Sequence, residues 1–176
     1  WNHLTGHTLG TTWVFGAFSQ LPIGNFVITP NKFIEVEQTQ NYSANPILYT
    51  DITAQANSGT YGGNVEIFKT GETSNAMYFG TLDKLDGIYV NLKTFGLGVT
   101  LITEYFAGGT WHNLSLAVNT YYDSTDNLRI SGGITWETST LIGWTQSYMP
   151  NLSGDGYQLY WVRLRTSTSP TIAPVA

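Results

Sequence analysis

Side chains able to do chemistry are few and scattered along this chain of 176 residues. There is no cysteine, which excludes disulfides, thiolate metal sites and a cysteine nucleophile. The three histidines are His3, His7 and His112. His3 and His7 are four residues apart, which suits a metal ion on a helix, but the Gly/Thr-rich segment around them has no helical pattern. We therefore expect no metal site, and a packing or surface role for His112.

Aspartates occur in pairs in predicted turns, and a pair of carboxylates is what a glycosidase needs. Such an enzyme holds its two carboxyl groups about 5 to 9.5 Å apart on opposite sides of the sugar. Turn aspartates more often close the turn through their own side chains, and the sequence lacks the common nucleophile, phosphate-loop and zinc motifs. We expect no catalytic residue and no cofactor; a glycoside hydrolase or lyase is the least favoured function. The aspartates considered are Asp83, Asp86, Asp123, Asp126 and Asp155.

Aromatic side chains are numerous, with six tryptophans and eleven tyrosines. Trp144 lies in a Gly/Thr/Ser-rich loop, and Tyr121 and Tyr122 precede a predicted turn. These three are the candidates for contact with a glycan or a protein partner. The alternative is the core, where large aromatic side chains usually pack and each bury about 150–250 Å². Trp136 and Trp161 lie in apolar strands and are expected in the core.

The surrounding sequence predicts an all-β fold. Helical periodicity is missing, and short runs of β-branched and aromatic residues alternate with turns containing Gly, Asn and Asp. This pattern predicts an antiparallel β-sandwich or a jelly-roll-like fold. The predicted strands cover residues 12–18, 32–37, 64–70, 76–81, 86–92, 99–106, 110–116, 127–136 and 157–166.

Two glycine pairs have particular meaning in these strands. Gly108 and Gly109 predict a tight hairpin turn between the strands of residues 104–114. Gly132 and Gly133 lie inside a strand pattern, which indicates a bulge or a close backbone approach.

Composition divides the chain into three parts. Residues 1–30 are aromatic and Gly-rich but poorly periodic, which suggests a less regular N-terminal arm. Residues 31–168 form the predicted sandwich, and the Pro/Thr-rich residues 169–176 are expected to be a tail or linker. The net charge is −5 with no basic run, so nucleic acid is not an expected partner. No apolar stretch approaches 18 residues, so no membrane span is expected.

The stretch YWVRLR, residues 160–165, places two of the seven basic residues in an apolar strand. Alternation puts Tyr160, Val162 and Leu164 on one face, expected to be the core face. The opposite face carries Trp161, Arg163 and Arg165. If something such as the N-terminal arm covers this face, Trp161 is part of the core and the two arginines need hydrogen-bond acceptors. We predict structural anchors here rather than a ligand strip, with Glu104 or Glu66 as acceptor and Trp161 available for cation–π stacking. The predicted anchors are Arg163, Arg165, Trp161 and Glu104.

Over residues 75–175 an ordered set of motifs resembles a known family. The set is AMYFG (76–80), LDGIYVNL (85–92), GVTLITEYFAGGTWHNL (98–114), DSTDNL (123–128), SGGITW (131–136), IGW (142–144) and LYWVRLRTST (159–168). It resembles the β-sandwich domain of structural proteins of tailed phages and related contractile particles. Phe106 stands where that family commonly has Trp.

The resemblance implies a non-enzymatic protein located in the virion. It would be a capsid decoration protein or a component of the tail, baseplate or fibre, without a cofactor. Its expected partners are other virion proteins and further copies of itself, assembled through subunit contacts. The alternative is a carbohydrate-binding module or host-receptor adhesin that uses exposed Trp and Tyr to bind a host-surface glycan.

Overall fold

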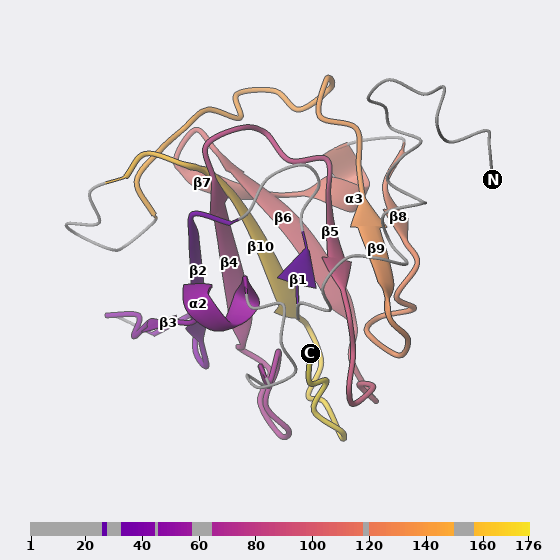
Figure 1. The fold of residues 1–176 in the computed structure, drawn as a ribbon. Helices are drawn as coiled ribbons and strands as arrows, with labels where there is room; N and C mark the ends of the chain where they lie inside the picture. The colour runs from indigo at the N-terminus through magenta and orange to yellow at the C-terminus, as the bar shows by residue number, and fades with distance from the viewer. Residues whose placement is uncertain (1–25, 28–32, 45, 58–64, 118–119, 150–156) are drawn as a thin grey trace.

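Two antiparallel sheets form the protein in the computed structural model (Figure 1). The structure describes residues 26–27, 33–44, 46–57, 65–117, 120–149 and 157–176. One sheet has the strand order β1-β5-β9-β8, and the other has the order β3-β2-β4-β10-β6-β7. This arrangement confirms the predicted all-β, antiparallel sandwich-like fold. The strands are β1 Phe26–Val27, β2 Glu35–Thr39, β3 Thr50–Asp51, β4 Ala76–Thr81, β5 Gly87–Val90, β6 Leu101–Ala107, β7 Thr110–Asn113, β8 Tyr122–Asp123, β9 Gly132–Thr135 and β10 Tyr160–Thr166.

Helix is confined to two single turns in the described residues, α2 Thr53–Ala56 and α3 Leu114–Ala117. The second shortens the strand predicted over 110–116, because the side-chain Oδ1 of Asn113 accepts hydrogen bonds from the main-chain N–H and the hydroxyl of Ser115. Asn113 thereby begins a helical turn as an N-cap residue does. No described helix has both the length and the apolar character needed to cross a membrane.

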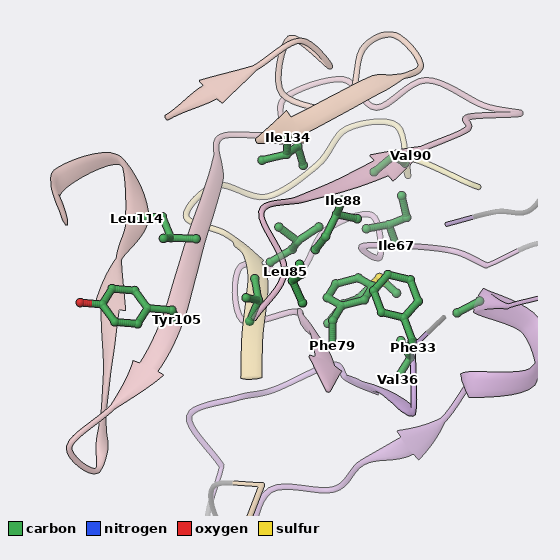
Figure 2. Packing of buried hydrophobic residues seen from close by; sticks show 14 of the residues in the cluster. Phe33, Val36, Ile67, Phe79, Leu85, Ile88, Val90, Tyr105, Leu114 and Ile134 are labelled. Atoms are coloured by element: carbon green, nitrogen blue, oxygen red, sulfur yellow. The ribbon is translucent and has the colours of Figure 1, made fainter. Parts of the chain in front are cut away.

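The hydrophobic core lies between the two sheets. Alternation along each strand sends every second side chain inward, so β-branched and aromatic residues from both sheets meet there. Phe33 packs against Phe79 with ring centroids 4.9 Å apart. Figure 2 shows the inward side chains of the two sheets gathered in this layer. The core side chains include Val36, Phe79, Val162 and Leu164 from the six-stranded sheet and Ile88, Val90 and Ile134 from the four-stranded sheet.

Both glycine pairs have the roles that their positions predict. Gly108 and Gly109 have φ values of 57° and 84° and form a two-residue turn between the paired residues Ala107 and Thr110. Positive φ at both positions is the geometry that favours glycine in a tight hairpin. At Gly132 an added Cβ would lie 2.6 Å from the hydroxyl oxygen of Ser124, so the close backbone approach is confirmed.

Two further predicted strands need correction. Of the strand predicted over 64–70, residues 65–70 do not form a named strand, and Glu66 makes an isolated bridge to Val175. The strand expected over 127–136 begins only at Gly132, because Asp126, Asn127 and Leu128 have positive φ and turn the chain away from an extended path.

The C-terminal residues 169–176 are not a free tail or linker. Val65 and Ala176 exchange main-chain hydrogen bonds of 2.9 Å in both directions, and Val175 accepts hydrogen bonds from Lys93 and Thr94. Ala176 is only 3% exposed and belongs to the core. The segment is held largely by its main chain, which composition does not reveal. The predicted arm of residues 1–30 lies outside the described residues except for β1.

Candidate functional site

The most elaborate group of polar and aromatic side chains lies on the outer face of the six-stranded sheet, the face turned away from the core. The alternation along β10 is as predicted: Val162 and Leu164 belong to the inter-sheet core, and Trp161 packs in a second apolar cluster. Trp161 is 0% exposed and Arg163 only 8%. The outer face is therefore covered here, and its charged groups are largely removed from water.

Glu104 of β6 is the acceptor for both arginines. Its Oε2 atom accepts hydrogen bonds from Nε of Arg163 at 2.8 Å and from Nε of Arg165 at 2.9 Å. Its Oε1 atom accepts a bond of 3.1 Å from Nη2 of Arg165. Strand register explains the meeting, since Glu104 is the cross-strand partner of Arg163. Of the two acceptors considered, Glu104 and not Glu66 receives these bonds; the anchor role itself stays a prediction.

Aromatic rings close over the two guanidinium groups. The Arg163 guanidinium carbon lies 4.4 Å from the Trp111 ring centroid, 5.2 Å from that of Tyr42 and 5.8 Å from that of Tyr78. Tyr42 also lies 5.7 Å from the guanidinium carbon of Arg165. These distances are within the range of cation–π attraction. We call Glu104, Arg163, Arg165, Trp111, Tyr42 and Tyr78 the Glu104 cluster.

Trp161 has a different role from the one that its place beside Arg163 predicts. Its indole Nε1–H donates a hydrogen bond of 2.9 Å to the carbonyl oxygen of Ser147. The ring lies over Gly80 of β4, where an added Cβ would come within 2.7 Å of it. The stacking partner of Arg163 is Trp111, across β6 on the edge strand β7. Trp161 thus ties the segment around Ser147 to the outer face.

Burial also changes the acid–base properties of the cluster. Desolvation raises the pKa of the Tyr78 phenol above its ordinary value, and it raises the pKa of Tyr49, whose ring lies 5.4 Å from that of Tyr78. Desolvation by itself lowers the pKa of Arg165, but the hydrogen bonds and attraction of Glu104 outweigh it, and the net pKa is raised. The raised pKa values keep the phenols of Tyr49 and Tyr78 protonated and the guanidinium of Arg165 charged. Fixed protonation states are expected for a structural anchor and not for a proton-transfer group.

Sequence reasoning missed the residues that cover this face. Tyr42 and Tyr49 come from the segment that links β2 to β3, which carries no strand signal. Trp111 has a readable signal, because alternation places it on the same strand face as Asn113, the cross-strand partner of Glu104. For Tyr42 and Tyr49 the sequence offers no comparable signal.

The three candidate contact residues have different surroundings. Trp144 is only 2% exposed, so its prediction as an exposed platform is wrong. Its ring packs edge-on at 5.8 Å from the ring of Tyr105 and at 5.7 Å from the ring of Tyr160.

The two tyrosines differ from each other in exposure. Tyr121 is half-buried, with its hydroxyl 2.9 Å from that of Thr103. Tyr122 alone is open, at 66% exposed. The core placement of Trp136, at 3% exposed, is confirmed.

Among the turn carboxylates, Asp123 closes its turn through its own side chain. Oδ1 of Asp123 accepts hydrogen bonds from the main-chain N–H and the hydroxyl of Thr125, and its Oδ2 accepts one from the N–H of Asn127. Asp126 forms an exposed ion pair of 3.4 Å with Arg129. Within the described ranges, no group of three His, Asp or Glu residues is placed to hold a metal ion. His3, His7 and Asp155 lie outside those ranges.

His112 lies at the edge of the sheet beside the hairpin turn. Its Nε2 atom is 3.0 Å from the Thr110 hydroxyl and 3.1 Å from the carbonyl oxygen of Ala107. The ring also packs at 5.3 Å from Tyr105. His112 is exposed, and these local contacts fit the packing or surface role expected from the sequence.

Comparison with known proteins gives no relative for this chain: no family model, no curated protein and no solved structure matches it. Function must therefore be argued from the residues themselves.

Proposed function

We propose that the protein is a non-enzymatic structural component of a phage virion, a capsid decoration protein or a part of the tail, baseplate or fibre. Its partners are other virion proteins and further copies of the same chain. The virion assignment rests on the ordered motifs of residues 75–175 and their resemblance to virion sandwich domains.

The observation that carries the assembly role is how the described side chains are distributed. Two of the few basic residues are covered on the outer face of the six-stranded sheet, where both pair with Glu104, whereas twelve large hydrophobic side chains of the described residues are exposed. Exposed apolar residues are common on protein surfaces, and those that a subunit contact covers add to its stability. The most exposed are Leu48 at 78%, Leu116 at 85% and Ile142 at 86%. Such a surface suits a protein that gains stability from subunit contacts.

The buried groups argue for the same kind of role. Every oxygen of Glu104 is used by an arginine of its own chain, and the rings of Trp111, Tyr42 and Tyr78 are used to cover those arginines. This cluster stabilises the sheet and commits both carboxylate oxygens of Glu104 to arginines of its own chain. A β domain that pairs these arginines and Glu104 with one another is suited to a structural place in a particle.

The test is detection of the chain in purified particles. Virions are banded by density, disrupted and analysed by mass spectrometry, and peptides of this chain are expected in constant ratio to the major capsid protein. Particles that lack it, made by a host that expresses it, would overturn the virion role.

The carbohydrate-binding alternative now depends on Tyr122. Trp144, its principal candidate, is buried, whereas Tyr122 is open to a sugar ring. A glycan array that shows specific binding, abolished by Tyr122→Ala, would replace the structural role with an adhesive one.

A further inference from the structure

The two edges of the six-stranded sheet differ in how they are protected. β3 is two residues long and ends in Asp51, which lies opposite Glu37 of β2. Short edge strands and charged side chains are the usual means of preventing sheet-to-sheet pairing. β7 is four residues long, Thr110–Asn113, with no charged residue and no proline. Among the described edge strands β7 is the longest, since β1, β3 and β8 each have two residues.

The hairpin register shows which main-chain groups of β7 face outward. Ala107 and Thr110 flank a two-residue turn with positive φ at both glycines, so they form a hydrogen-bonded pair. Bonding alternates along an antiparallel ladder, and the N–H and C=O of Trp111 therefore point away from β6. Within the described part of the chain, no other segment bonds to these two groups. Trp111 offers one donor and one acceptor to a further strand.

The chemistry of this edge fits a second copy of the chain. Two copies with a net charge of −5 each repel one another, so a contact between them is favoured where carboxylates are missing. β7 carries no carboxylate, whereas β3 carries Asp51 and β8 carries Asp123. Leu116 on the adjoining turn α3 is 85% exposed and supplies apolar surface beside the edge. An added Cβ at Gly108 or Gly109 would meet nothing within 4 Å, so the space around the turn is open to a neighbour.

We propose that β7 pairs antiparallel with β7 of a second copy, about a twofold axis near Trp111. Each Trp111 N–H then donates to the Trp111 carbonyl of the other copy, and the two six-stranded sheets join into one continuous sheet. Such an isologous contact is closed, so it produces a dimer and not a filament. The inference deepens the assembly role proposed above and rests on it, because it names the surface by which the chain meets itself.

The experiment uses the side chains of Thr110 and His112, which are exposed and share one face of β7. The double variant Thr110→Lys with His112→Lys makes the edge basic, and Thr110→Glu with His112→Glu makes it acidic. Like charges facing each other across paired strands are destabilising. Sedimentation velocity should show dimers for the unaltered chain, monomers for each double variant alone, and dimers again when the two variants are mixed. Thr50→Lys, on the other edge of the same sheet, is the control and should leave the dimer intact.

Each outcome is decisive for the contact. An unaltered chain that stays monomeric, or a dimer unaffected by both double variants, overturns the proposal. Melting curves select double variants that retain the fold. Folded variants that are monomeric and do not associate when mixed also overturn the proposal, because opposite charges across the paired strands should restore the contact. None of these results bears on whether the chain is found in virions, which mass spectrometry tests separately.

Discussion

The Nη2 atom of Arg163 lies 2.6 Å from the Oε2 atom of Glu104, and both side chains are buried on an outer sheet face covered by aromatic rings. Removing one partner of a buried ion pair leaves an uncompensated charge. We therefore expect Glu104→Ala to lower the free energy of unfolding by about 3–5 kcal/mol, measured by urea denaturation. Arg129→Ala is the matched control, since its pair with Asp126 is about 60% exposed and should contribute about 0–1 kcal/mol. Equal small effects would contradict the anchor role.

Close packing of Trp161 on Gly80 makes a second prediction. A Cβ at Gly80 would lie 2.6 Å from Cδ1 of Leu159 and 2.7 Å from the Trp161 ring, so both side chains would have to shift. Gly80→Ala should lower stability by about 1–3 kcal/mol, the usual cost of overpacking. Gly133→Ala is the control, because its nearest neighbour would be 3.7 Å away. Similar denaturation midpoints for the two variants would contradict this packing.

The regular part of the fold was readable from the sequence because alternation controls it. Residues 160–165 predict both faces of β10, and the need for an acceptor pointed to Glu104 because it lies on a neighbouring strand. Gly108 and Gly109 predict the hairpin through their backbone freedom. In each case the physical cause is local, or acts across one strand pair.

The predictions that failed concern segments whose surroundings are set by residues distant in the sequence. Trp144 lies in a loop-like sequence, but nothing nearby shows that Tyr105 and Tyr160 provide a place for its ring. The Pro/Thr-rich C-terminus resembles a linker in composition, yet main-chain hydrogen bonds hold it to Val65 and Lys93, and these depend little on side-chain type.

Trp144 is expected to act in stability and not in binding. Trp144→Ala removes a ring that is buried against two others, and large-to-small core substitutions of Trp cost about 3–5 kcal/mol. Thermal melting should show a large drop for this variant. Tyr122→Ala, at an exposed site, should change stability by less than about 0.5 kcal/mol. A Trp144→Ala protein of unchanged stability would mean that the ring is not packed in the core.

The C-terminal segment is expected to be part of the cooperative fold. Deleting Val175 and Ala176 removes the main-chain bonds to Val65, Lys93 and Thr94 and opens the core at Ala176. The shortened chain should unfold at lower urea, and the Val65 amide should lose protection from hydrogen exchange. Ile172→Ala keeps the main chain and serves as the control. If the deletion leaves both the unfolding midpoint and the protection unchanged, the segment behaves as a tail after all.

Alkaline pH should destabilise the protein through Tyr49 and Tyr78. Burial raises the pKa of both phenols, so the folded state retains protons that the unfolded chain releases near pH 10. Their contribution to stability is complete below about pH 10 and is lost as the pH rises through the folded-state pKa values. Phenolate absorbance should show that Tyr49 and Tyr78 ionise only as the fold opens. With Tyr49→Phe and Tyr78→Phe together, the fall in unfolding free energy above pH 10 should be shallower; an unchanged slope would place the cause elsewhere.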